Sequence, residues 1–219
     1  MSSADAVVLS YNECLLRESD LHLLKGPYWL NDSVISFYFE YLQSDLFRDF
    51  PQLLFVSPEV TQCIKVSPQR DIGIFLDPLV SNLQRDFIFF ALNDNESTDS
   101  SGGSHWSLLV FSRPEQTVFH YDSSNGSNEM PALELSQKIL KYFSMDAIGR
   151  FESMACLQQN NGYDCGVHVM CNAEHLASYA SHYGMIRGCP KLDYESVMAK
   201  RWEVLDIIDK LRNKNYKDS

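Results

Sequence analysis

Apolar residues recur at helical spacing in two segments of the first third of the chain. Between residues 34 and 42 they follow Asn31 and Asp32, either of which can cap a helix that begins there. The sequence Ser-Pro-Glu at 57–59 predicts the start of a second helix. Ser favours the N-cap, Pro suits the first helical position and Glu favours the positive end of the helix dipole. The apolar face of each segment indicates that both helices pack against a core.

The pattern changes in the middle of the chain, where apolar residues form nearly continuous runs. Residues 87–92 predict a fully buried strand, and residues 105–111 and 117–122 predict two further strands joined by a turn at 112–114. Between the first two strands, residues 93–104 are all Asn, Asp, Glu, Ser, Thr or Gly. Because a long polar loop inside a compact domain usually has a function, this loop is a candidate functional segment.

The last third of the chain returns mainly to helices. We expect a surface helix over 132–143, a fourth strand over 150–155, a helix over 165–179 that follows a turn-rich Asn-Asn-Gly, and an amphipathic helix over 194–211. The strands gather in the middle of the chain, with helices before and after them. This order indicates the α+β class with a central sheet.

Composition indicates one globular domain. The chain has 219 residues, of which 45% are hydrophobic and 12% aromatic, and this is too rich in core-forming residues for a disordered chain. The formal net charge is 18 − 29 = −11. Duplex nucleic acid, whose binding requires several Lys or Arg side chains at phosphates, is therefore not expected as a partner, and a basic partner suits the charge better.

Neither a membrane span nor an export signal is predicted. The longest apolar stretch has six residues, whereas a spanning helix needs about 20. The six cysteines include no CxxC pair in a chain that is large enough to fold without disulfides, which favours a reducing cytoplasmic or nuclear compartment. Cys165, His168 and Cys171 approach a metal site but lack a second ligand pair, so we expect neither a metal nor a cofactor.

Three residues that carry chemistry lie at the ends of predicted elements: His105 starts one strand, Asp122 ends the next, and Cys165 starts a helix. Antiparallel strands joined by a short turn bring His105 and Asp122 to the same edge, where the carboxylate can orient the imidazole. A helix N-terminus and a neighbouring imidazolium both favour the thiolate of Cys165. A buried Cys alone is more often a small hydrophobe, but the combination predicts a nucleophile and its base.

Gln159 lies six residues before Cys165, ahead of a flexible Asn-Asn-Gly. Its side-chain amide and the backbone N–H of Cys165 are suited to form an oxyanion hole for acyl transfer. On physical grounds alone, an ordinary loop glutamine is the preferred explanation of the residue, and the oxyanion role is the alternative.

Four stretches of the chain together resemble one family, the ubiquitin-like-protein proteases of the Ulp and sentrin-specific group. They are Trp-Leu-Asn-Asp at 29–32, Gly-Ser-His-Trp-Ser at 103–107, His-Tyr-Asp-Ser at 120–123 and Gln-Asn-Asn-Gly-Tyr-Asp-Cys-Gly at 159–166. The order His, Asp, Gln, Cys is that of the family, whereas papain-type enzymes have Gln, Cys, His, Asn. The resemblance covers roughly residues 7–211. It implies a papain-like cysteine protease architecture of the Ulp type, with a central mixed sheet flanked by helices, in a single catalytic domain over 1–219 with short flexible termini.

Within this family, further segments are most similar to the deneddylase branch, and they cover residues 7–11, 26–32, 57–60 and 93–95. That branch removes the modifier called NEDD or Rub from conjugates such as cullins. The resemblance therefore implies a monomeric, thiol-dependent isopeptidase that cuts after the C-terminal Gly-Gly of this modifier, in conjugates or in its precursor. A SUMO-specific protease is the alternative within the enzyme class. A module that binds a modifier without cutting it is the alternative outside that class.

The resemblance also implies roles for matching residues. Cys165 is the nucleophile, His105 the general base, Asp122 the residue that orients the base, and Gln159 the oxyanion donor. All four residue types of the family are present, which argues against a module that only binds.

Two tryptophans match aromatics that, in the family, close a tunnel over the modifier's terminal Gly-Gly. They are Trp29 and Trp106, and the tunnel excludes side chains because only glycine fits between two indole faces. For Trp29, a core position is an equally good explanation. Asp32 matches an acid that contacts the substrate, although helix capping explains it as well. The polar loop matches one that closes on the bound modifier, and its first residues are Asn93, Asp94 and Asn95.

Overall fold

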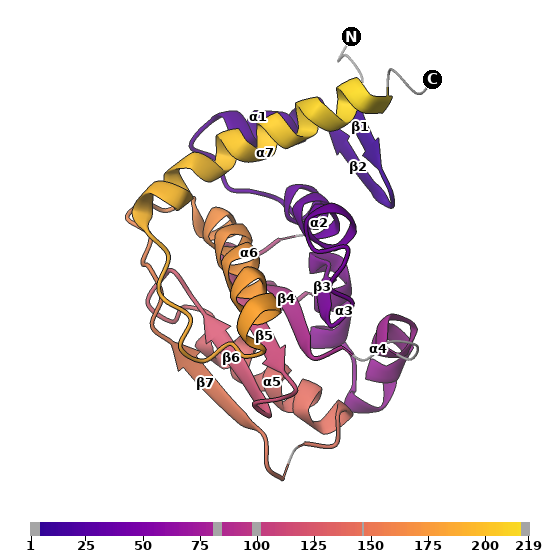
Figure 1. The fold of residues 1–219 in the computed structure, drawn as a ribbon, viewed down its shortest axis with the longest axis vertical. Coiled ribbons are helices and arrows are strands. Elements are labelled where there is room, and N and C mark those ends of the chain that lie inside the picture. Colours follow the sequence, from indigo (N-terminus) through magenta and orange to yellow (C-terminus); the bar gives the residue numbers. More distant parts are fainter. Residues whose placement is uncertain (1–4, 81–84, 98–101, 146, 216–219) are drawn as a thin grey trace.

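The structure, a computed structural model, describes residues 5–80, 85–97, 102–145 and 147–215. At its centre is a five-stranded sheet formed, in spatial order, by β3 (Leu53–Val56), β4 (Phe87–Asn93), β5 (Trp106–Ser112), β6 (Thr117–Tyr121) and β7 (Arg150–Met154). The outer pairs, β3 with β4 and β6 with β7, are parallel, and the inner pairs are antiparallel (Figure 1). The sheet is therefore mixed, and the predicted α+β class is confirmed.

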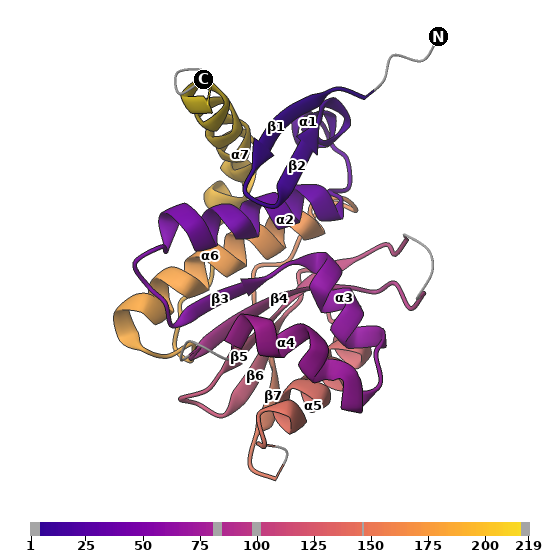
Figure 2. The same cartoon turned by 90° about the vertical axis from the view of Figure 1, so that its right-hand side faces the viewer.

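Helices cover both faces of the sheet (Figure 2). One face is covered by α2 (Asp32–Tyr41) and α6 (Cys165–Tyr183), which contact each other. The other face is covered by α3 (Pro58–Val66), α4 (Ile72–Val80) and α5 (Glu129–Tyr142).

An outer layer lies on α2 and α6, on the side away from the sheet. It consists of a hairpin of β1 (Val7–Tyr11) and β2 (Cys14–Arg17), together with α1 (Glu18–Lys25) and α7 (Tyr194–Asn215). Two short segments complete the described elements, a π-helical turn at Leu42–Leu46 after α2 and a 3-10 turn at Gln69–Asp71 before α4.

Alternation of side chains along the central strands divides the core into two clusters. In β4, Phe89 belongs to the cluster under α2 and α6, whereas its neighbour Phe90 belongs to the cluster under α3, α4 and α5. Successive side chains of a strand point to opposite faces. Because both faces of β4 are covered by helices, the strand appears in the sequence as an uninterrupted apolar run.

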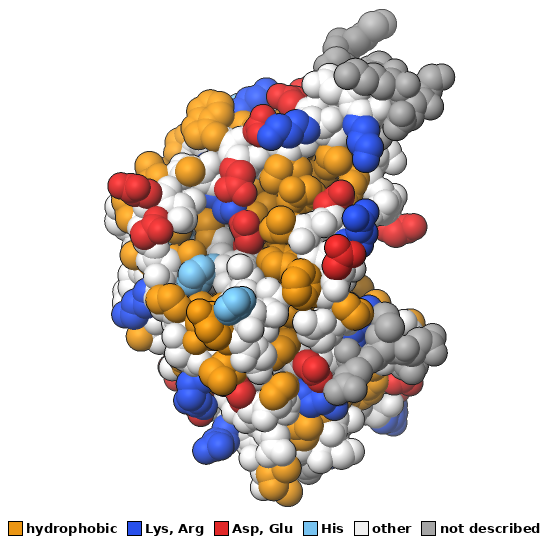
Figure 3. All heavy atoms as spheres, viewed as in Figure 1, with side chains coloured by type: hydrophobic (Ala, Val, Ile, Leu, Met, Phe, Trp, Pro, Cys, Tyr) orange, Lys and Arg blue, Asp and Glu red, His pale blue; other side chains and the backbone are white. Residues whose placement is uncertain are grey.

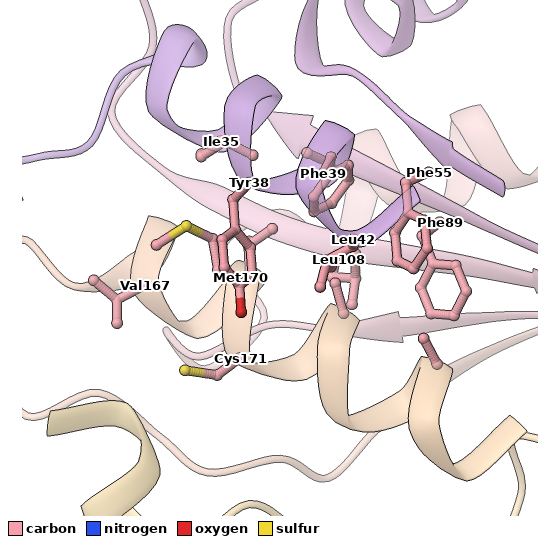
Figure 4. Close-up of a cluster of buried hydrophobic side chains, with 14 of the residues drawn as sticks. Ile35, Tyr38, Phe39, Leu42, Phe55, Phe89, Leu108, Val167, Met170 and Cys171 are labelled. Atoms are coloured by element: carbon pink, nitrogen blue, oxygen red, sulfur yellow. The ribbon is translucent and has the colours of Figure 1, made fainter. Parts of the chain in front are cut away.

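Figure 4 shows the first cluster, in which Tyr38 of α2 and Met170 of α6 meet side chains of the sheet. Leu108 of β5 is fully buried there. Trp106 lies two residues earlier on the same strand and belongs to the same cluster. The alternation thus places Trp106 on the sheet face that α6 covers.

The two predicted N-caps are present. Asn31 accepts a hydrogen bond from the N–H of Val34 at 3.2 Å, and Ser57 accepts one from the N–H of Val60 at 3.4 Å. The cap of α2 is therefore Asn31, and Asp32 is the first residue of the helix. Asp32 therefore does not cap the helix, and capping does not explain why an acid lies at this position.

Some element ends differ from the predicted ones, because tertiary contacts set them. The strand predicted from residue 105 begins at Trp106, since the N–H of His105 bonds to the carboxylate of Asp94. The helix predicted from residue 132 begins at Glu129, directly after Asn128, whose N–H bonds to the carboxylate of Asp122.

Four parts of the fold have no clear signal in the sequence: the β1–β2 hairpin, α1, β3 and α4. β3 has only four residues, all buried, and a short apolar run of this kind cannot be told from a piece of buried helix by its periodicity. Its place in the sheet depends on β4, which begins more than 30 residues later.

The surface carries charges of both signs. Figure 3 shows Lys and Arg side chains scattered among Asp and Glu side chains on one face, rather than gathered into a basic patch. Among the described helices, none has the length and apolarity that a membrane crossing requires.

Candidate active site

His105 and Asp122 form a buried pair at one edge of the sheet. Leu108 of β5 pairs with Tyr121 of β6, so the residue before β5 and the residue after β6 lie at the same edge. Nε2 of His105 lies 2.6 Å from Oδ1 of Asp122. The predicted proximity of these two residues is confirmed.

Backbone amides keep the Asp122 carboxylate charged. The N–H of Ser124 donates to Oδ1 and the N–H of Asn128 donates to Oδ2, each at 2.8 Å. Burial acts to raise the pKa of Asp122, but the hydrogen bonds from His105, Asn128 and Ser124 outweigh burial and hold the pKa below its ordinary value. Asp122 therefore presents a negative charge to His105 at neutral pH.

Cys165 is the first residue of α6, and its side chain is buried. The first amides of a helix have no partners within the helix, so their N–H groups and partial positive charge lie beside this residue. Since Nε2 of His105 is bound to Asp122, Nδ1 is the ring nitrogen available to Cys165.

The contacts of His105 favour its charged form. Burial acts to lower the pKa of the imidazole, but hydrogen bonds to Asp122 and to Cys165, together with their negative charges, raise the pKa of His105 to about 9. The site therefore holds an imidazolium beside the sulfur of Cys165 at neutral pH.

Gln159 lies half-buried in the turn before α6. Its backbone N–H donates to the carbonyl of Ser123 at 2.9 Å, and its Oε1 accepts from the hydroxyl of Ser123 at 2.8 Å. Its Nε2 donates to the carbonyl of Asn161 at 2.7 Å. An amide nitrogen carries two hydrogens, so a second one is available to an oxyanion. The oxyanion role itself stays a prediction.

A cavity of about 250 Å³ lies beside Cys165. Trp29 and Trp106 line it, but they differ in exposure, with 53% of Trp29 exposed and 6% of Trp106. Trp29 is therefore not a core residue. The indole N–H of Trp29 donates to the carbonyl of Gly162 at 2.6 Å, and that of Trp106 donates to the carbonyl of Leu30 at 3.0 Å. Both rings are thus held in place at the walls of one cavity.

The base of the polar loop is attached to the start of β5. Asp94 accepts hydrogen bonds from the N–H and the hydroxyl of Ser104 at 2.6 and 2.7 Å, and from the N–H of His105 at 3.0 Å. Gly103 has a φ of +90°, and a Cβ at this position would lie 1.8 Å from Oδ1 of Asn93, so only glycine fits. Asn93 and Gly103 line the cavity, whereas Asp94 anchors the loop beside it.

The other predicted substrate-contacting residues have different positions. Asp32 is exposed and lines the cavity. Asn95 lies farther along the loop, where its carbonyl accepts hydrogen bonds from Gln62 and Lys65 of α3 and ties the loop to that helix. Residues 98–101 of the predicted loop lie outside the described residues.

Two residues that the sequence analysis did not single out support the site. The side chain of Asn128 donates to the carbonyl of His105 at 3.3 Å and to the hydroxyl of Ser107 at 3.1 Å. Arg201 of α7 pairs with Asp164, the residue before Cys165. No local pattern in the sequence predicts the contacts of Asn128 or of Arg201. In each case the partners lie far apart along the chain and meet only in the folded protein.

A larger cavity of about 410 Å³ lies between β2, α2 and α3. Its lining includes Cys14, whose pKa is raised to about 11 by burial and by nearby carboxylates, and the residues that line it include no His. It therefore offers no activated nucleophile. Among the residues that the structure describes, no group of three or more His, Cys, Asp or Glu side chains is placed to hold a metal ion.

A thiol at a helix start, hydrogen-bonded to a His that an Asp orients, is the constellation of a cysteine-type peptidase. Residues 80–209 match the family described as the Ulp1 protease family, C-terminal catalytic domain. This chain belongs to that family.

Comparison with individual proteins agrees with this assignment. Sentrin-specific protease 8 of Rattus norvegicus is 41% identical over 215 residues, which cover 96% of this chain and 98% of that protein. NEDD8-specific protease 1 of Arabidopsis thaliana is 34% identical over 187 residues, which cover 84% and 81%. The fold is similar to the solved C-terminal Ulp1 protease domain in complex with Smt3, the yeast ortholog of SUMO. The TM-score is 0.74 at 21% identity, and the match covers 96% of this chain and 90% of that one.

Proposed function

We propose that this protein is an isopeptidase that cleaves after the C-terminal Gly-Gly of NEDD8, the NEDD or Rub modifier, in conjugates such as those of cullins or in the modifier's precursor. The observation that carries the proposal is the convergence of Cys165, Trp29 and Trp106 on one cavity, beside the paired His105 and Asp122. The names of the relatives, sentrin-specific protease 8 and NEDD8-specific protease 1, support the choice of modifier.

In the proposed reaction, the proton of Cys165 resides on His105 and the thiolate attacks the carbonyl carbon of the terminal Gly. The backbone N–H of Cys165 and the amide of Gln159 stabilise the oxyanion. The imidazolium of His105 gives its proton to the departing lysine amine, and a thioester forms between Cys165 and the modifier. Water, deprotonated by His105, then hydrolyses the thioester, which releases the modifier's carboxylate and restores the thiol.

The same cavity accounts for selectivity toward glycine. Trp29 and Trp106 line a small cavity that Cys165 also lines, and a tail without side chains is the kind that so small a cavity accepts beside two indole rings. The net charge of −11, and Asp32 at the cavity, suit a modifier tail that carries Arg before its glycines.

We also propose that the protein acts as a monomer in the cytoplasm, the nucleus or both. All six cysteines are free thiols, which supports a reducing compartment. A SUMO-specific protease is the competing hypothesis within the enzyme class, and a module that only binds a modifier is the competing hypothesis outside it. The paired His105 and Asp122 beside Cys165 favour an enzyme over such a module.

Labelling with modifiers that carry a C-terminal electrophile tests the function and the modifier preference together. We expect electrophilic NEDD8 to form a covalent adduct at Cys165 faster than electrophilic SUMO or ubiquitin does. Cys165→Ala should form no adduct, and the matched variant Cys63→Ala, which removes an exposed thiol, should label like wild type. An adduct that persists in Cys165→Ala contradicts the nucleophile. Faster reaction with SUMO favours the competing protease, and no adduct with any modifier favours the binding module.

A further inference from the structure

Arg201 lies in α7, outside the cavity, and only 13% of its side chain is exposed. Its Nη1 donates to the carbonyl of Leu23 at 2.7 Å, and its Nη2 donates to the carbonyl of Tyr28 at 2.8 Å. Nε and Nη2 also donate to Oδ1 of Asp164, at 3.1 and 2.8 Å. One guanidinium therefore joins α1, the segment after α1 and the turn before α6.

Two of these partners are chain neighbours of residues that line the cavity. Tyr28 precedes Trp29, and Asp164 precedes Cys165. Because consecutive Cα atoms are about 3.8 Å apart and the peptide between them is rigid, a shift of either partner is passed on to its neighbour. Arg201 thus joins the segment that carries Trp29 to the turn that carries Cys165, through Tyr28 and Asp164.

The turn that Arg201 holds is itself well ordered by hydrogen bonds. Oδ2 of Asp164 accepts from the side-chain amide of Asn161 at 2.7 Å, and Oδ1 of Asn161 accepts from the N–H groups of Tyr163 and Asp164 at 3.0 Å. Both members of the Arg201–Asp164 pair are shielded, at 13% exposure each, so salt screens their attraction weakly. Because these hydrogen bonds hold the turn together, the position of Asp164 sets the position of the whole turn.

We propose that Arg201 is a positioning residue that holds the Trp29 segment against the turn bearing Cys165, so that the Gly carbonyl in the cavity lies within reach of the thiolate. This inference rests on the proposed function. A residue that acts in this way affects the chemical step on a bound tail. It leaves the binding of the modifier's body and the intrinsic reactivity of the thiol unchanged.

The decisive variant is Arg201→Lys, which keeps the positive charge but lacks the planar fork of five donors that serves several partners at once. The matched control is Arg212→Gln, since Arg212 lies on the same helix and pairs with Asp209 at 3.6 Å, away from the site. Two kinds of measurement are made on each protein. The first is kcat and KM on NEDD8 with a C-terminal fluorogenic amide. The second is the rate of alkylation of Cys165 by iodoacetamide, followed by mass spectrometry.

We expect Arg201→Lys to lower kcat by about 10- to 100-fold, which is the cost of a misplacement of up to about 1 Å, while KM and the alkylation rate stay within about threefold of wild type. Arg212→Gln should match wild type in all three quantities. Asp164→Asn keeps the shape of the partner and removes its charge. It should also lower kcat and leave KM near the wild-type value. The double variant should lose less than the product of the two single effects, because both changes remove one interaction.

Two results would overturn the inference. One is a kcat of Arg201→Lys equal to that of wild type. The other is a loss of kcat and of alkylation in the same proportion as the folded fraction measured by circular dichroism, because Arg201 would then only support the fold. Failure of wild type and Arg212→Gln to cleave the NEDD8 substrate is a different result. It contradicts the proposed function. Arg201→Lys is then compared with wild type on whichever of the SUMO and ubiquitin substrates the wild type cleaves. If the wild type cleaves neither of these substrates, the inference fails together with the proposed function.

Discussion

The protonation of His105 sets the pH range in which the site works. The pKa of His105 is about 9, because hydrogen bonds to Asp122 and Cys165 outweigh the opposing effect of burial. The imidazolium that protonates the leaving amine is therefore populated at neutral pH. Its contribution to the stability of the fold is complete below the unfolded pKa of 6.5 and is lost as the pH rises through about 9.

We expect kcat/KM on the NEDD8 substrate to fall along an alkaline limb centred near pH 9, as His105 loses its proton. Initial rates measured from pH 6 to pH 10.5 locate this limb. A profile that stays flat through pH 10 would contradict the protonation state assigned to His105.

Asp122→Asn removes the charge that stabilises the imidazolium and favours the wrong tautomer of His105. We expect kcat to fall by about 10³- to 10⁴-fold with KM nearly unchanged. The alkaline limb should also move to lower pH, because Asp122 is one cause of the raised pKa of His105. Asp49→Asn, at a side chain that is 88% exposed, is the matched control. Unchanged turnover in Asp122→Asn would remove Asp122 from the mechanism.

Gln159→Ala removes one proposed oxyanion donor. We expect the activation free energy to rise by about 2–4 kcal/mol, seen as a lower kcat at unchanged KM. Ser123→Ala keeps the Gln159 amide and removes only the hydroxyl that orients it, so it should raise the activation free energy by less. If Gln159→Ala has wild-type turnover, the oxyanion role belongs to another group.

At the scale of the element, β6 buries a histidine that has no part in the proposed chemistry. His120 is 1% exposed, and neither ring nitrogen has a hydrogen-bond partner among the described residues. Burial lowers its pKa to about 4, so His120 is neutral in the folded protein. Between pH 6.5 and pH 4 the unfolded chain binds more protons at this position, and the free energy of unfolding falls as the pH falls.

We expect acidification to pH 5 to cost the wild type roughly 2 kcal/mol through His120 alone. His120→Phe, which keeps an aromatic ring against Phe151, should lack this part of the acid sensitivity. Urea unfolding of both proteins at pH 7.5 and pH 5 measures the difference. Equal acid sensitivity in the two proteins would mean that His120 is not buried as a neutral ring.

The two tryptophan walls belong to different elements, since Trp106 begins β5 and Trp29 follows α1. We expect replacement of the modifier's last Gly by Ala to reduce cleavage by at least about 100-fold, because a methyl group beside the two indoles displaces the scissile bond from Cys165. Trp106→Ala should not rescue this tail and should lower turnover on the natural tail, because the indole also positions that bond.

Initial rates of both enzymes on Gly-Gly and Gly-Ala tails test this expectation, with Trp202→Ala as the control for loss of an exposed indole on α7. Efficient cleavage of the Gly-Ala tail by wild type would show that the two indoles do not enclose the tail.

At the scale of the whole molecule, the net charge of −11 affects the rate at which enzyme and modifier associate, rather than the chemical step. We expect kcat/KM for a modifier with a basic tail to fall as ionic strength rises from about 0.01 to 1 M, over which the Debye length shrinks from about 30 to 3 Å. The value of kcat should change little. A value of kcat/KM that is independent of salt would mean that the acidic surface does not attract the modifier.

Much of the fold follows from short-range patterns, and some of it does not. The continuous apolar run of β4 and the caps Asn31 and Ser57 were predictable because each depends on residues only a few positions apart. β3 was not predictable, because four apolar residues take no definite form until β4 pairs with them. The extent of the single catalytic domain over 1–219 stays a prediction.

The sequence by itself determined which chemical groups are present and where along the chain they lie. A short turn between two strands was enough to place His105 beside Asp122, and a helix start was enough to set Cys165 among free amides. Only the tertiary structure decided that Trp29 is an exposed wall of the cavity rather than a core residue. It also decided that Arg201 reaches Asp164 and Tyr28, which lie 37 and 173 residues away along the chain. The physical reason is that local patterns set hydrogen bonds between near neighbours, whereas contacts over such separations form only when helices pack on the finished sheet.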